Sequence, residues 1–247
     1  MNSRIQDEEL SPAKRIVFFD TLRGFTLLSM IAFHSTYDLA YLYGFNLPWF
    51  TSSPFQDAWR ASISWTFLLL AGWMTQHSRN NLKRGLSYAI AAIIVYLVTS
   101  FASVDTPISF GILYCMAFCT IVYSATSFIF KRFNPYIAII ICIGLFAFTY
   151  NVPASVYPFN GLSWLGFPSR GFASGDYYPP LPYFFLYAIG VNSAIIYLRN
   201  KKRKDAYPAW MKRDFCPPLT MIGRHSLIIY LAHQPIVLVA LALALGR

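Results

Sequence analysis

The stretch RGFTLLSMIAFHSTYDL, residues 23–39, is apolar enough to belong to a membrane helix, yet it contains an arginine, a histidine and an aspartate. In hydrocarbon such side chains are costly, and they occur mostly where they face a protein interior or a water-filled cavity. Arg23 and His34 are 11 residues apart, which places them on one helix face about 16 Å apart. His34 and Asp38 have i,i+4 spacing, so the carboxylate could orient the imidazole. The stretch therefore predicts a membrane helix that carries a candidate functional site.

The composition of the whole chain agrees with a membrane protein. Of its 247 residues 56% are hydrophobic and only 12% are charged, whereas soluble domains carry roughly 25% charged residues. The formal net charge is +10, but the basic residues lie in short clusters between apolar runs, as in cytoplasmic loops. We therefore expect the chain to lie in a lipid bilayer and not to bind nucleic acid.

The four cysteines indicate neither a disulfide framework nor a metal site. Three of them lie inside apolar runs, and Cys115 and Cys119, at i,i+4 spacing, have no histidine or carboxylate beside them. Zinc sites in proteins combine several Cys, His or carboxylate ligands. We expect these cysteines to be small packing residues and the protein to need no metal.

The apolar segments predict an all-α, polytopic helix bundle of about seven transmembrane helices, because a span needs about 20 mostly apolar residues. Residues 1–15 are polar, without a secretory signal, and predict a cytosolic tail; 16–247 predict a single transmembrane domain. The expected spans are 16–43, 57–76, 85–104, 108–130, 135–152, 181–199 and 224–245.

The distribution of basic residues predicts the orientation of these spans. With the N-terminus inside, 16 of the 20 lysines and arginines fall on inner segments, three (Arg60, Arg170 and Arg247) fall on outer ones, and Arg23 lies within the first span. Cytoplasmic loops carry such an excess, so we expect N-in and C-out topology. The inner segment 200–223 includes the basic run KKRK, residues 201–204, which is typical of a topogenic or lipid-facing cluster. The same positive charge could instead attract a phosphorylated cytosolic donor.

Polar residues recur in the last span, in GRHSLIIYLAHQPI, residues 223–236. Arg224 and His225 are expected at its inner end. His233 follows nine residues after Arg224, about 13 Å further along a continuous helix, and Gln234 lies at the same depth. Intramembrane polar residues indicate a site, although in both spans they could instead only bond one another and fix helix packing.

Four blocks resemble a known family: FDTLRGFTLLSMIAFHSTYDL (19–39), GILYCMAF (111–118), DYYPPLPYFFLYAIG (176–190) and the 223–236 block. Together they are similar to the heparan-alpha-glucosaminide N-acetyltransferase catalytic family. The resemblance implies a multi-pass enzyme that takes an acyl group, usually acetyl, from cytosolic acyl-CoA and delivers it to a sugar-like acceptor across the membrane. Related members also suggest a homodimer.

The resemblance matches Arg23, His34, Asp176 and His233 to family positions, and the spacing and placement of the polar side chains add the other candidates. His34 and His233 are expected to be catalytic with Asp38, while Arg23 serves the acyl-CoA donor. Arg224 and His225, at the inner end of the last span, are expected to bind the donor too. Asp176 and Gln234 are the candidates for acceptor binding.

A different function would explain the intramembrane His34 and Asp38 equally well. A proton-coupled transporter also needs ionisable groups inside the membrane, although transporters often show inverted repeats and none is evident here. The absence of a repeat and the four blocks favour the acyltransferase. We expect the protein in the cytoplasmic membrane.

Overall fold

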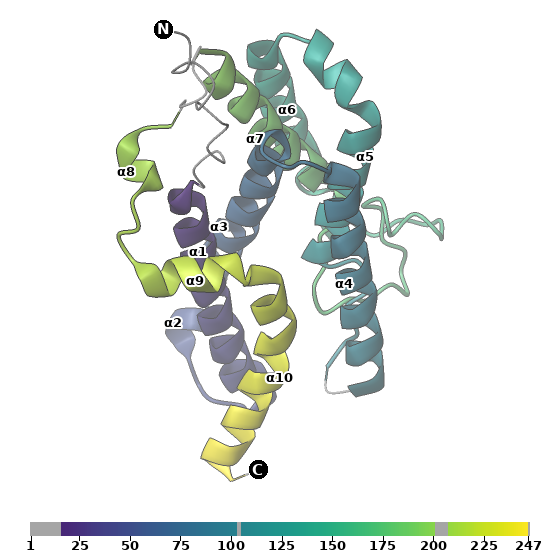
Figure 1. Ribbon diagram of the computed structural model, residues 1–247. Helices are drawn as coiled ribbons and strands as arrows, with labels where there is room; N and C mark the ends of the chain where they lie inside the picture. Colours follow the sequence, from purple (N-terminus) through teal and green to yellow (C-terminus); the bar gives the residue numbers. More distant parts are fainter. Residues whose placement is uncertain (1–15, 103–104, 201–206, 247) are drawn as a thin grey trace, which may run out of the picture. The chain divides into compact units, whose positions relative to one another are not determined.

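A computed structural model describes residues 16–102, 105–200 and 207–246, which are helical without a β-strand (Figure 1). The expected tail, 1–15, and the basic run at 201–204 lie outside the described residues. The helices are α1 (Val17–Tyr37), η1 (Asp38–Leu42), α2 (Pro48–Thr51), α3 (Ser53–Trp73), η2 (Met74–Gln76), α4 (Asn81–Ala102), α5 (Ile112–Arg132), α6 (Pro135–Thr149), η3 (Val152–Ala154), α7 (Pro180–Asn200), α8 (Ala209–Lys212), α9 (Pro217–Arg224) and α10 (Ser226–Leu245).

Each predicted span corresponds to one long helix, and within the described residues five helices are long and apolar enough to cross a membrane. These are α4, α5, α6 (extended to Ala154), α7 and α10. Helices α1 and α3 have 21 residues each, but charged side chains lie within them, Asp20 and Arg23 in α1 and Asp57 and Arg60 in α3. The all-helical membrane fold is therefore confirmed, while the count of seven and the orientation stay predictions.

The chain divides into two compact units. Unit 1 comprises residues up to Ser35 together with those from Asn200 onward, and unit 2 comprises Thr36–Arg199. Unit 1 thus joins α1 to α8, α9 and α10, and unit 2 holds the helices from η1 to α7. The single domain expected over 16–247 stays a prediction.

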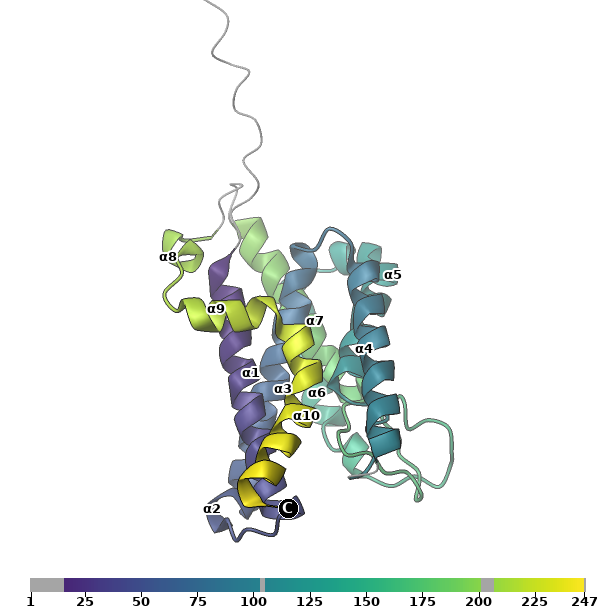
Figure 2. The same ribbon diagram turned by 60° about the horizontal axis from the view of Figure 1, so that its bottom comes forward.

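In unit 1, α9 lies directly across α1 (Figures 1 and 2). The crossing is possible because two glycines face the opposite backbone. A Cβ atom on Gly24 would overlap the Leu219 carbonyl, and one on Gly223 would overlap the Asp20 carbonyl. Small residues let helix backbones approach closely in membrane proteins, so the crossing fixes α9 against the N-terminal half of α1.

In unit 2, glycines bring α3 and α7 together in the same way. A Cβ on Gly72 would meet the Tyr187 carbonyl, and one on Gly190 would meet the Leu69 carbonyl. Helices α4 and α5 lie side by side (Figure 2), with Gly85 facing Ile121. The result is a bundle in which α6 contributes little to the interior, since most of its side chains are exposed, as expected for a lipid-facing helix.

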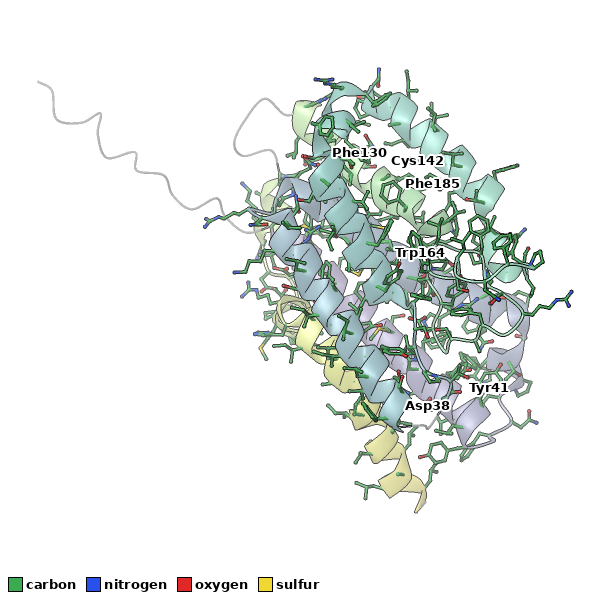
Figure 3. The ribbon with its side chains drawn as sticks, turned by 90° about the vertical axis from the view of Figure 1, so that its right-hand side faces the viewer. Asp38, Tyr41, Phe130, Cys142, Trp164 and Phe185 are labelled. Carbon is green, nitrogen blue, oxygen red and sulfur yellow. The ribbon has the colours of Figure 1, made fainter. Side chains whose placement is uncertain are left out.

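The long aromatic loop between α6 and α7 is tied to the segment before α5. Backbone N–H groups of Gly175 and Tyr178 donate to the carbonyls of Pro107 and Phe110, at 3.3 and 2.8 Å. Trp164 lies in this loop (Figure 3) and its carbonyl accepts a hydrogen bond of 3.3 Å from the Tyr114 hydroxyl. These contacts hold Asp176 at the start of α5.

Candidate active site

Two histidines from opposite ends of the chain meet in unit 1. The ring centroids of His34, on α1, and His233, on α10, are 5.2 Å apart with the planes tilted by 52°. His34 is half-buried, and its ring also contacts Phe33 edge-on. His233 is buried. The structure therefore brings together the two residues that the sequence marks as catalytic candidates on separate helices.

A backbone carbonyl of α10 determines which ring nitrogen of His233 carries the proton. Its Nδ1 lies within hydrogen-bond distance of the Tyr230 carbonyl oxygen. A carbonyl can only accept, so Nδ1 carries the proton and the neutral ring keeps its lone pair on Nε2. Among the described residues Nε2 has no hydrogen-bond partner. In this form His233 is suited to accept a proton through Nε2.

A carboxylate on α1 is shared by two arginines. Arg23 Nη1 donates to Asp20 Oδ1 at 2.8 Å, and Arg224 Nε, at the end of α9, lies 3.9 Å from Asp20 Oδ2. Asp20 is buried, whereas Arg224 is partly exposed. This trio carries one carboxylate and two guanidinium groups, which leaves a positive charge and suits an anion such as a phosphate.

Hydroxyl groups support the same helix crossing. The Oγ1 atoms of Thr21 and Thr220 are 2.8 Å apart, and Thr220 Oγ1 lies 2.8 Å from Asp214 Oδ1. Thr220 is buried. The contacts fix α9 against α1 and so hold Arg224 close to Asp20.

Arg224 and His225 differ from their predicted place in the last span. The backbone at His225 leaves the helical conformation (φ −104°, ψ 22°), so α9 ends at Arg224 and α10 begins at Ser226. The depth of about 13 Å assumed one continuous helix from Arg224, and that assumption was wrong. His225 is exposed, and its Nδ1 lies 3.0 Å from the Met221 carbonyl oxygen.

Asp38 and Gln234 each follow one of the two histidines closely along the chain. Asp38 is buried and begins η1, a π-helical turn in unit 2, whereas His34 belongs to unit 1. Figure 3 shows Asp38 near Tyr41 at one end of unit 2, with Phe130 near the other. Gln234 is half-buried on α10. The pairing of Asp38 with His34 stays a prediction.

Asp176 caps a helix in unit 2. Its Oδ2 accepts a hydrogen bond of 3.2 Å from the backbone N–H of Ile112, in the first turn of α5. Burial raises the pKa of Asp176 to about 6, while the Ile112 hydrogen bond and the positive charge of Arg60 oppose the rise. A carboxylate is favourable at a helix N-terminus, so Asp176 has a structural role whatever it binds.

Comparison with known proteins decides the family. Residues 15–235 match the family described as heparan-alpha-glucosaminide N-acetyltransferase, catalytic. The chain belongs to this family. No curated protein and no solved structure matches the chain. Membership in an acetyltransferase family implies a transferase and does not favour the transporter alternative.

The match places the site residues within the heparan-alpha-glucosaminide N-acetyltransferase family region. All eight candidates lie inside the matched range, the last being His233 and Gln234 near its end. Three features of the site were not found from the sequence: the sharing of Asp20 by Arg224, the Thr220 hydroxyl contact and the Tyr230 carbonyl. The first two depend on contacts between residues about 200 positions apart, which no local pattern reveals.

Proposed function

We propose that this protein is a membrane-bound acyltransferase that moves an acetyl group from acyl-CoA on the inner side to a sugar-like acceptor at the outer face. One observation carries the proposal: α1 contributes Arg23 to the pair of arginines around Asp20 and, about 16 Å further along, a histidine that meets a second histidine from α10. The family supports acetyl transfer, and the arrangement suits an acyl-CoA donor that approaches the histidines from the arginine end of α1.

The donor is proposed to bind at the Asp20, Arg23 and Arg224 trio, with His225 beside it. Acyl-CoA carries several phosphate charges, and guanidinium groups bind phosphate with charge-assisted hydrogen bonds. Asp20 holds Arg23 and Arg224 near each other before any donor arrives. Preorganised groups lose less freedom on binding, so the trio favours binding of the donor phosphates. The arginines can then bond the phosphates in addition to Asp20 or in its place.

The transfer itself needs one base and one leaving group. A histidine Nε2 lone pair accepts the proton of the acceptor hydroxyl or amine, and the acceptor atom attacks the thioester carbonyl carbon. The carbon–sulfur bond breaks, and the CoA thiolate takes up a proton. In a second route His34 first receives the acetyl group and then passes it on. Both routes use the His34 and His233 pair, with Asp38 proposed to orient His34.

The acceptor residues are proposed on sequence grounds. Asp176 and Gln234 carry groups that can hydrogen-bond a sugar hydroxyl or amine. Asp176 already accepts from Ile112 N–H through Oδ2, so its other oxygen is the one proposed to meet the acceptor.

The test is acetyl transfer by purified protein in sealed vesicles. Vesicles loaded with acetyl-CoA labelled in the acetyl group receive hexoses and hexosamines outside, and the external sugars are analysed for label. Label is expected in at least one sugar, and only when the protein is present. If the vesicles bind acetyl-CoA yet no external sugar acquires label, the proposal of a sugar acceptor is wrong. Label that moves out as intact acetyl-CoA would instead indicate transport.

A further inference from the structure

The segment 207–225, which contains α8 and α9 and leads directly into α10, exposes large apolar side chains. Trp210 is 53% exposed, and Phe215 and Met221 are each 66% exposed. Helix α10 is one of the five candidate membrane spans and begins at Ser226. The exposed apolar groups therefore belong to a segment joined covalently to the end of a membrane helix.

Aromatic contacts fix one end of the 207–225 segment against the start of α1. The Trp210 ring packs edge-on against Phe18 at 5.4 Å, and the Tyr207 ring against Phe19 at 5.8 Å. Both phenylalanines lie in the first turn of α1. Tryptophan and tyrosine are enriched where membrane helices meet the headgroups, and this cluster occupies such a helix end.

The crossing of α9 lies slightly deeper along α1. Gly24, where α9 crosses, is seven residues after Val17, the first residue of α1. Seven residues correspond to about 10 Å of helix. Amphipathic helices at a membrane surface lie about 5–10 Å into the boundary between headgroups and acyl chains. Helix α9, which runs across α1 in both views (Figures 1 and 2), has the orientation of such a helix.

The charge of the 207–225 segment matches an anionic surface. Its basic side chains are Lys212, Arg213 and Arg224, and its one acidic residue is Asp214. The Arg213 guanidinium lies over the Phe215 ring, 5.5 Å from its centroid. A cation beside an exposed aromatic ring can reach a headgroup phosphate while the ring enters the apolar layer.

We infer that the 207–225 segment is an interfacial element that binds anionic phospholipid headgroups through Lys212 and Arg213, with Trp210, Phe215 and Met221 inserted beside them. The combination of apolar exposure, positive charge and covalent continuity with α10 favours lipid over a protein partner. The inference is independent of acetyl transfer, since it concerns only how this segment meets the bilayer.

The charge component is tested with full-length protein in vesicles of phosphatidylcholine alone or with phosphatidylglycerol. The thermal unfolding temperature is expected to rise when phosphatidylglycerol is present. This rise is expected to be at most half as large in the K212E/R213E double variant. The matched control is R79E/K83E, which reverses two exposed basic residues, one just before α4 and one in its first turn. Equal losses in both double variants, or the same upward shift with inorganic phosphate alone, would overturn the assignment.

The depth component is tested on Trp210. The difference in tryptophan fluorescence between the wild type and Trp210→Phe isolates this residue from the other five tryptophans. Quenching of the difference signal by lipids brominated near the headgroup end of the acyl chain, with little quenching by aqueous iodide, is expected. Strong quenching by iodide and none by brominated lipid would place Trp210 in water and leave a protein partner as the occupant.

Discussion

The ring centroids of His34 and His233 lie 5.2 Å apart, although the two residues stand near opposite ends of the chain. Their helices, α1 and α10, therefore form the contact on which the proposed chemistry depends. His233 is oriented by the Tyr230 carbonyl, whereas the orienting partner proposed for His34 is Asp38. The two histidines are thus expected to have different tasks.

We predict that His34→Ala abolishes acetyl transfer in a protein that still inserts and binds acetyl-CoA. If His34 and His233 act on one proton-transfer step, the double variant with His233→Ala should be no slower than the more severe single variant, because residues that act as a unit are non-additive. Rates are measured in the vesicle assay, with His77→Ala in unit 2 as the control. Near-normal transfer by folded His34→Ala protein would remove His34 from the mechanism and leave His233 as the base.

Asp38→Asn is expected to reduce turnover by roughly 10²–10⁴-fold, the usual range for assistance in acid–base catalysis. The reason is that an amide holds the imidazole without stabilising its protonated form. The expected loss is in kcat, with donor affinity unchanged. A loss confined to the amount of folded protein would show that the buried Asp38 only supports η1.

Arg23→Ala and Arg224→Ala are expected to weaken acetyl-CoA binding by about tenfold or more, since a hydrogen bond to a charged group contributes about 1.5–3 kcal/mol. Arg23 is about 16 Å from His34 along α1, so kcat should change much less than the donor KM. The binding should also weaken as salt rises, because partly exposed phosphate contacts are screened.

Arg170→Ala is the matched control, because Arg170 is exposed in the loop before α7. Its acetyl-CoA affinity should equal that of the wild type. If Arg23→Ala and Arg224→Ala also leave the affinity unchanged, the donor site lies elsewhere.

The sequence predicted the helices better than the contacts. The expected spans 85–104 and 181–199 agree with α4 and α7 to within a few residues, because long apolar runs are a local property. It placed Arg224 in the last span, since nothing local revealed that the helix breaks at His225. The Asp20–Arg23 pair is a local contact, because residues at i,i+3 spacing lie on the same helix face. The second arginine on Asp20 is a tertiary contact and could not be read from spacing.

Gly24→Ala is predicted to destabilise the protein by about 1–3 kcal/mol, the usual cost of forcing extra volume into a packed contact. A Cβ there would overlap the Leu219 carbonyl, so α9 would be displaced and Arg224 moved from Asp20. The thermal unfolding temperature and the affinity for acetyl-CoA should both fall. Gly144→Ala is the control, because Gly144 is also inside a helix but has open space around it; it should be neutral or slightly stabilising. Equal behaviour of the two variants would contradict the close crossing.

Asp176→Asn is predicted to flatten the dependence of stability on pH. Burial raises the pKa of Asp176 from 3.8 to about 6, so the folded state holds this proton more tightly than the unfolded state does. Stability should therefore fall as pH rises from about 4 to about 6. The asparagine cannot ionise, and its carbonyl oxygen can still accept from Ile112 N–H, so the cap on α5 is kept.

Asp176→Asn should accordingly match the wild type near pH 4 and exceed it above pH 6, by about 1–3 kcal/mol, since one pKa unit corresponds to about 1.4 kcal/mol. The measurement is thermal unfolding in detergent micelles between pH 4 and pH 8. Asp57→Asn is the control for the loss of one carboxylate, because Asp57 is exposed and accepts from Arg60 at 2.9 Å; it should show no gain in stability above pH 6. Parallel curves for Asp176→Asn and the wild type would show that the Asp176 carboxyl titrates alike in the folded and unfolded chains, and burial would then not govern it.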